Sequence, residues 1–176
     1  MTEAQPNTQT GSILFTDLVG FTEFNDAVGD IAAVDVLDQQ VAMARDILCG
    51  HGHARIVKEL GDGLMLWFDG ARCAVEQSMR LLKAIEGARD AGDFPLSIRM
   101  GLHRGPAVVR GSDLAGQTIN IGARVADLAG PGELLATDDA VTPDDLDRAG
   151  LRSHPVGPVQ VKGVSSAIWI QRIEPN

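Results

Sequence analysis

The sequence predicts an α+β fold in which helices pack on one face of a mainly antiparallel sheet. Three observations support this prediction. The apolar run 12–18 has the length of a strand, two later pairs of strand-like runs are each joined by a short glycine-containing loop, and segments with apolar residues at helical spacing separate these strands. This order is that of a ferredoxin-like, split βαβ sheet, followed here by a small C-terminal strand system.

Two helices are expected directly after the first strand. A glycine turn leads into a short helix over 21–28, and Asp30 can cap a second helix over 31–48. The apolar residues of the second helix recur at helical spacing, at Ile31, Val34, Leu37, Val41, Ala44 and Leu48. This stripe is the expected buried face of the helix.

The rest of the chain alternates between strand pairs and helices. The elements expected, in chain order, are a hairpin over 55–60 and 64–68, a helix over 71–89, a strand pair over 95–102 and 106–110 that turns at 103–105, a helix over 118–128, a strand over 133–137 and a final hairpin over 159–162 and 167–172. The segment 142–157 is polar and rich in Pro and Asp, so irregular structure is expected there.

Length and composition favour one domain. The chain has 176 residues, of which 44% are apolar, and this suits a single core over 12–176 preceded by a flexible polar tail over 1–11. The longest apolar run, 64–68, is too short to insert in a membrane, and no secretory signal is apparent. With only two cysteines, Cys49 and Cys73, reduced thiols and a cytoplasmic location are expected.

The formal net charge of −9 restricts the partners of the chain. A protein this acidic is a poor general binder of nucleic acid or of an anionic membrane surface. An anionic ligand would therefore need a locally basic site, or metal ions between it and the protein.

Two carboxylates are placed where they could hold such metal ions. Asp17 ends the first strand and Asp62 lies at the tip of the first hairpin, so both fall at one edge of the sheet if the hairpin lies beside that strand. Hard carboxylate ligands suit magnesium, which shares its shell with phosphates. The helix that opens at Phe21 adds free N–H groups for an anion. The simpler interpretation is that both aspartates only stabilise turns.

Four further polar residues are candidates for ligand binding. Asn120 and Arg124 share one face of the helix 118–128, where an amide and a guanidinium together can hold charge on a phosphate. Lys58 lies on a half-buried strand and Asp113 in the loop before that helix. Each of the four, taken alone, is also explained as an ordinary solvated residue.

These residues fall in motifs whose order resembles that of class III nucleotide cyclase catalytic domains, from about residue 12 to 173. The matching stretches are Phe15–Thr22 for the first metal motif, Lys58–Gly63 for the second, Gly101–Gly105 for a glycine-bounded turn, Asp113–Arg124 for specificity and transition-state residues, and Ala129–Glu133 and Val161–Gly163 for later landmarks. The resemblance implies a palm-type sheet and a bacterial-like adenylate cyclase, which turns ATP into cyclic AMP and pyrophosphate.

The resemblance also assigns a role to each residue. It implies that Asp17, Asp62 and the carbonyl of Leu18 bind two divalent ions, Mg²⁺ or Mn²⁺. Substrate contacts are implied for Phe21, Thr22, Lys58, Asp113 and Lys162, with Lys162 near the terminal phosphates. Asn120 would orient the ribose and Arg124 would steady the reacting phosphate.

Base selectivity and assembly follow from the same resemblance. Lys58 can donate to N1 of adenine and Asp113 can accept from its amine, whereas guanine reverses this pattern. In this family, the metal-binding aspartates of one subunit and the substrate-binding residues of the other form each site at the dimer interface. A chain that holds both sets is therefore expected to form a homodimer with two equivalent sites. Ala115 and Gly122 depart from the usual aromatic residue and alanine of the family, and Gly122 is expected to weaken its helix.

Two other functions stay open on the sequence. One is a guanylate cyclase or another palm-type nucleotidyl cyclase, which the Lys58 and Asp113 pair disfavours. The other is a catalytically silent cyclase-like module that binds nucleotide without turnover, which the complete residue set disfavours.

Overall fold

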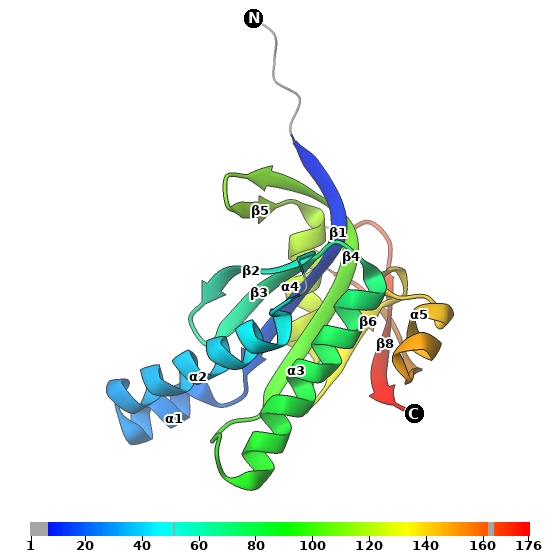
Figure 1. Cartoon of the computed structure of the whole chain (residues 1–176). Coiled ribbons are helices and arrows are strands. Elements are labelled where there is room, and N and C mark those ends of the chain that lie inside the picture. The colour runs from blue at the N-terminus through cyan, green and yellow to red at the C-terminus, as the bar shows by residue number, and fades with distance from the viewer. Residues whose placement is uncertain (1–6, 51, 162–163) are drawn as a thin grey trace, which may run out of the picture.

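The computed structural model describes residues 7–50, 52–161 and 164–176. An eight-stranded sheet, mostly antiparallel, carries helices on its faces, and the predicted α+β class is confirmed (Figure 1). The strands are β1 (Thr8–Leu18), β2 (Ala54–Leu60), β3 (Gly63–Phe68), β4 (Ile98–Arg110), β5 (Asp113–Ala115), β6 (Leu134–Thr137), β7 (Leu151–Val159) and β8 (Ile168–Pro175). The helices are α1 (Phe21–Val28), α2 (Asp30–Leu48), α3 (Ala71–Ala91), α4 (Gln117–Leu128) and α5 (Pro143–Ala149), with a 3₁₀ turn, η1 (Asp138–Ala140).

The sheet order is β2-β3-β1-β4-β6-β8-β7, with β5 paired to β4. Strand β1 lies between β3 and β4 and is antiparallel to both, while β4 and β6 are parallel. Successive side chains of β1 point to opposite faces. Leu14 and Leu18 therefore join one core cluster with α2 and α3, whereas Ile13 and Phe15 join a second cluster with α4.

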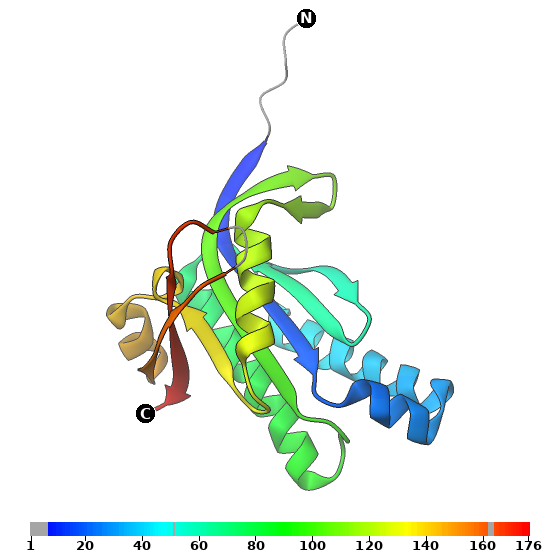
Figure 2. The ribbon, with the colours of Figure 1, turned by 180° about the vertical axis from the view of Figure 1, so that it is seen from behind.

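Helix α4 is the exception to the expected packing of helices on one face. It lies across β4 and β1 on the face opposite α2 and α3, as the two opposed views show (Figures 1 and 2). Two glycines allow this close approach. A Cβ at Gly101 would overlap the main chain of Ala126, and one at Gly122 would lie 2.7 Å from Cγ2 of Ile13. Gly122 is thus required by packing, whatever it costs the helix.

Strand β4 is continuous through 103–105, so the turn predicted there is wrong. The glycines that suggested a turn serve the packing of α4 instead. A Cβ at Gly105 would lie 2.6 Å from Oγ1 of Thr118, the residue whose hydroxyl donates to the carbonyl of Pro106 at 2.6 Å. Glycine within a strand often marks such a close approach.

The segment 142–157 is also regular, contrary to expectation. Thr142 begins α5 with a capping box, in which its hydroxyl accepts from the Asp145 N–H and the Asp145 carboxylate accepts from the Thr142 N–H. Strand β7 follows, and its prolines Pro155 and Pro158 are tolerated because β7 is an edge strand. The final hairpin therefore pairs β7 with β8, rather than a strand over 159–162.

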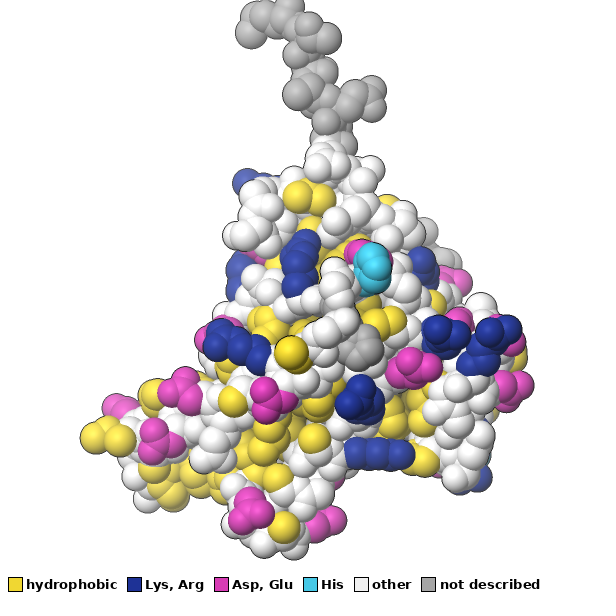
Figure 3. All heavy atoms as spheres, viewed as in Figure 1, with side chains coloured by type: hydrophobic (Ala, Val, Ile, Leu, Met, Phe, Trp, Pro, Cys, Tyr) yellow, Lys and Arg dark blue, Asp and Glu magenta, His cyan; other side chains and the backbone are white. Residues whose placement is uncertain are grey.

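Two N-terminal predictions also need correction. Strand β1 begins at Thr8, so Thr8–Gly11 belongs to the sheet and not to a tail. In α2, Gly29 is the N-cap. The predicted buried stripe is confirmed at Val41, Ala44 and Leu48 but is wrong in the first turns of the helix, where Ile31 and Val34 are 85% and 52% exposed. Hydrophobic atoms are accordingly visible over the α1–α2 end of the molecule (Figure 3).

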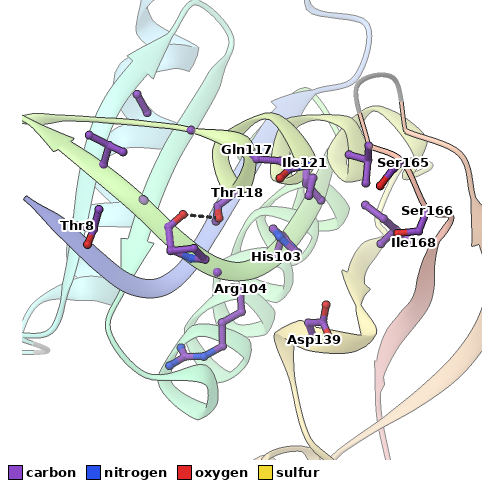
Figure 4. A pocket seen from close by; sticks show the side chains of 17 residues that line it. Thr8, His103, Arg104, Gln117, Thr118, Ile121, Asp139, Ser165, Ser166 and Ile168 are labelled. Atoms are coloured by element: carbon purple, nitrogen blue, oxygen red, sulfur yellow. Dashed lines mark hydrogen bonds between the residues drawn. The ribbon is translucent and has the colours of Figure 1, made fainter. Parts of the chain in front are cut away.

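A cavity of about 670 Å³ lies beside β4 and the start of α4, and His103 lines it (Figure 4). His103 is only 6% exposed, and its Nδ1 lies 2.8 Å from Oγ1 of Thr137. Burial lowers the pKa of His103 from 6.5 to about 4. The folded protein therefore holds this ring neutral at a pH where the unfolded chain would protonate it.

Acid should destabilise the fold through His103. Because the pKa of His103 is lower in the folded state than in the unfolded state, the neutral ring contributes to the free energy of unfolding. This contribution is fully present above the unfolded-state pKa and is lost as the pH falls towards the folded-state pKa. We expect the free energy of unfolding to fall by about 3 kcal/mol between roughly pH 7 and pH 4 on this account. Urea unfolding at several pH values measures the loss. The His103→Asn protein, which cannot titrate there, should show a smaller slope, and an equal slope would contradict the assignment.

Candidate active site

The two aspartates come together at one edge of the sheet, as predicted. Asp17 stands opposite Gly63 in the β1–β3 register, and the Leu18 N–H donates to the Asp62 carbonyl at 3.3 Å. Asp62 lies in the β2–β3 turn. Gly63 is required here, because a Cβ on it would overlap the Thr16 carbonyl. Partial burial, followed by the negative charge of Asp17, raises the pKa of Asp62.

This pair fits a divalent cation. Two neighbouring carboxylates offer hard oxygen ligands, and a cation between them would offset the repulsion that raises the pKa of Asp62. Within the part of the chain that the structure describes, no group of three or more His, Cys, Asp or Glu side chains is arranged to hold a metal. Main-chain oxygens, water or a bound phosphate would complete the shell.

Arg99 is a site residue that the sequence analysis missed. Its Nε donates to Oδ2 of Asp17 at 2.7 Å, and its guanidinium also donates to the Asp127 carbonyl at 3.3 Å. The two residues are register partners on β1 and β4, and both are 31% exposed. An arginine between the apolar residues Ile98 and Met100 was the available signal, but its partner becomes clear only once the strands are paired.

Helix α1 begins directly beyond Asp17 and Leu18. Gly20, with a φ of 78°, turns the chain, and the first main-chain bond of the helix runs from the Phe24 N–H to the Gly20 carbonyl. The N–H groups before Phe24, those of Phe21 and Thr22 among them, begin the helix and have no acceptor within it. Phe21 is partly buried against the core and Thr22 is exposed. The helix start therefore offers N–H donors within a few residues of Asp17 in the chain.

Lys58 and Asp113 are hydrogen-bonded to each other, although they are 55 positions apart. Lys58 lies after an irregularity in the β2–β3 register, and Asp113 opens β5. The Lys58 ammonium, and then the Leu114 N–H, lower the pKa of Asp113. The structure thus brings together one cation and one carboxylate, which offer a donor and an acceptor to the same ligand.

Asn120 and Arg124 lie on the exposed face of α4, and Ile121 and Val125 on its buried face. The Arg124 guanidinium contacts Oδ2 of Asp127 at 3.3 Å, an exposed pair that holds it only weakly. Lys162 lies outside the described residues. The predicted amide and guanidinium do share one accessible helix face.

The carboxylates and the other polar residues form two separate groups in one chain. Asp17 follows Ile13 and Phe15 on the α4 side of the sheet, and Lys58 pairs across to Met65 on that same side. No hydrogen bond or ion pair between described residues links Asp17 or Asp62 to Lys58, Asp113, Asn120 or Arg124. Asp17 and Lys58 therefore lie on the same side of the sheet, but no direct contact between described residues joins the aspartates to the other four residues.

No helix in the described parts of the chain is long and apolar enough to cross a membrane.

Among curated proteins, the chain is 25% identical over 170 residues to a pH-sensitive adenylate cyclase of Mycobacterium tuberculosis, covering 96% of this chain and 41% of that protein. It is 27% identical over 128 residues to an adenylate cyclase of Streptomyces griseus, covering 73% of this chain and 31% of that protein. The chain thus spans less than half the length of these relatives.

Solved cyclase structures share the fold. The adenylyl cyclase CyaB from P. aeruginosa superposes with a TM-score of 0.84 at 22% identity, over 98% of this chain and 97% of that one. The guanylyl cyclase Cya2 superposes with a TM-score of 0.77 at 23% identity, over 98% and 95%. Residues 3–172 match the family model described as the adenylate and guanylate cyclase catalytic domain. With the sheet, the paired aspartates and the polar helix face in place, the chain belongs to the adenylate and guanylate cyclase catalytic domain family.

Proposed function

We propose that this domain is an adenylate cyclase, which converts ATP to 3′,5′-cyclic AMP and pyrophosphate at sites shared between two copies of the chain. The observation that favours ATP over GTP is the pairing of Lys58 with Asp113. Together they present one donor and one acceptor, the pattern that complements N1 and the exocyclic amine of adenine. Guanine would place a donor against the lysine and an acceptor against the carboxylate, leaving polar groups unpaired.

The aspartate pair is proposed to hold two divalent ions, Mg²⁺ or Mn²⁺, with the Leu18 carbonyl as a further ligand. Such ions, when bound, activate the ribose 3′-hydroxyl and neutralise the phosphates. Arg99 keeps Oδ2 of Asp17 engaged, so it limits the directions in which this carboxylate can turn. The N–H groups at the start of α1, from Phe21 and Thr22, can hold phosphate oxygens beside the carboxylates.

Asn120 and Arg124 are proposed to act on the reacting part of the nucleotide. Both are exposed on α4, and Arg124 has only a weak partner to give up. Asn120 would orient the ribose so that its 3′-oxygen lies in line with the α-phosphorus, and Arg124 would stabilise the charge that develops there. Lys162 is assigned to the terminal phosphates by the family resemblance alone.

A homodimer is proposed because the two groups do not meet within one chain. A two-fold pairing of the α4 faces would place the aspartates of one copy against the Lys58, Asp113, Asn120 and Arg124 of its partner. The relatives named as adenylate cyclases, from Mycobacterium tuberculosis and Streptomyces griseus, support the reaction class.

A product assay tests the proposed function. The purified chain is incubated with ATP or GTP and either Mg²⁺ or Mn²⁺, and cyclic nucleotide and pyrophosphate are measured. We expect cyclic AMP with equimolar pyrophosphate. Cyclic GMP as the main product would make the domain a guanylate cyclase, and no product from either nucleotide would leave it a silent module.

A further inference from the structure

Two buried polar side chains lie in the core behind the aspartates. Thr16 is 4% exposed and Gln40 is 1% exposed. The Gln40 side-chain amide lies 3.2 Å from Oγ1 of Thr16, and the Leu64 N–H donates to the same oxygen at 3.0 Å. Gln40 belongs to α2, Thr16 to β1 and Leu64 to β3, so this network joins three elements at one hydroxyl.

The position of the network in the chain relates it to both carboxylates. Thr16 directly precedes Asp17, and Leu64 follows Asp62 by two residues. Thr16 and Leu64 are also register partners in the β1–β3 pair. Fixing them to each other therefore fixes the two main-chain segments that carry Asp17 and Asp62. Gln40 adds a third point of attachment, from a helix that otherwise buries apolar residues at this face.

A polar network inside an apolar core is costly unless it is satisfied. Leu14, Leu18, Val36, Val41 and Leu66 are among the buried residues of this core. An apolar residue in place of Gln40 would pack there without needing a partner, so packing alone gives no reason for the amide. The network is better explained by what it positions.

We propose that Thr16 and Gln40 are positioning residues, which hold Asp17 and Asp62 at the spacing that a divalent ion requires. This inference rests on the proposed metal-dependent function. Groups that orient metal ligands typically change metal affinity by about 10- to 100-fold when they are removed. Removing the Thr16 hydroxyl removes an acceptor of the Leu64 N–H and the partner of the Gln40 amide, and so loosens the attachment between the ends of β1 and β3.

The test measures Mn²⁺ binding to the purified chain without nucleotide, by electron paramagnetic resonance, together with kcat, KM and the Tm. Thr16→Val keeps the shape and removes the hydroxyl, whereas Thr16→Ser keeps the hydroxyl. Gln40→Met removes the amide at similar volume. Gln77→Met is the matched control, because Gln77 is 3% exposed and is hydrogen-bonded by Arg80 on α3, away from the aspartates.

We expect Thr16→Val and Gln40→Met to raise the Kd for Mn²⁺ by about 10-fold or more, with Thr16→Ser close to the unmodified chain. Gln77→Met should lower the Tm and leave the Kd unchanged. If Thr16→Val does not fold, Gln40→Met supplies the same comparison. Unchanged Mn²⁺ affinity in the variants, with a Tm loss like that of Gln77→Met, would overturn the positioning role alone. Failure of the unmodified chain to bind Mn²⁺, both alone and with pyrophosphate present to complete the shell, would overturn the metal site as well.

Discussion

Mixing the Asp17→Ala and Asn120→Ala proteins should restore cyclase activity that neither protein has alone. Each variant homodimer has the same defect in both of its sites. A mixed dimer combines the intact Asp17 and Asp62 of one copy with the intact Asn120 and Arg124 of the other, and so contains one complete site. With random exchange of equal amounts, half of the dimers are mixed and activity should reach about a quarter of the unmodified level.

The control for this experiment pairs two defects of the same group. A mixture of Asp17→Ala and Asp62→Ala proteins forms mixed dimers too, yet each of their sites lacks one carboxylate. This mixture should stay inactive. Subunit exchange is checked by mass spectrometry of differently tagged copies. Exchange without recovery of activity in the first mixture would show that the sites are not shared.

Lys58→Glu should change base selectivity by a large factor. The substitution replaces the donor with an acceptor, and it places two carboxylates side by side where Lys58 and Asp113 now form a hydrogen bond. Loss of a charge-assisted contact to N1 of adenine should lower kcat/KM for ATP by about 10- to 100-fold. GTP should lose far less, because guanine presents a donor at N1 that a carboxylate accepts.

The measurement is the ratio of kcat/KM for ATP to that for GTP in the two proteins. Lys83→Glu is the matched control, since Lys83 is an exposed residue of α3 on the opposite side of the sheet. It makes the same change in net charge and should leave the ratio unaltered. An unchanged ratio in Lys58→Glu would refute the role of Lys58 in reading the base.

The features that the sequence predicted well depend on short stretches of chain. A strand that ends in a turn and a hairpin closed by Gly61–Asp62–Gly63 are local features. They place both aspartates at one sheet edge once the hairpin lies beside the first strand, a pairing that the structure shows. The ion pair of Arg99 with Asp17 was not found, because it depends on which strands lie side by side. The contact between Lys58 and Asp113 has the same origin, since β2 and β5 meet only in the folded chain.

The wrong predictions also have physical causes. Glycine both permits a turn and makes room for a neighbour, and the sequence does not say which use applies at Gly101 and Gly105. Pro and Asp after Thr142 suit irregular structure, but Pro is also favoured in the first turn of a helix, and here these residues belong to a capped helix. In α2, a search for apolar spacing could not detect that a buried position holds Gln40.

The contact between Lys58 and Asp113 has a consequence for nucleotide binding under the proposed function. These two groups satisfy each other in the structure, so an arriving base competes with a partner that is already present. A base that hydrogen-bonds to both Lys58 and Asp113 replaces the contact that it breaks, so separating the two residues costs little free energy. A base that hydrogen-bonds to only one of them leaves the other without a partner. Such an arrangement lowers affinity for every purine, and it increases the difference between the matching base and the others.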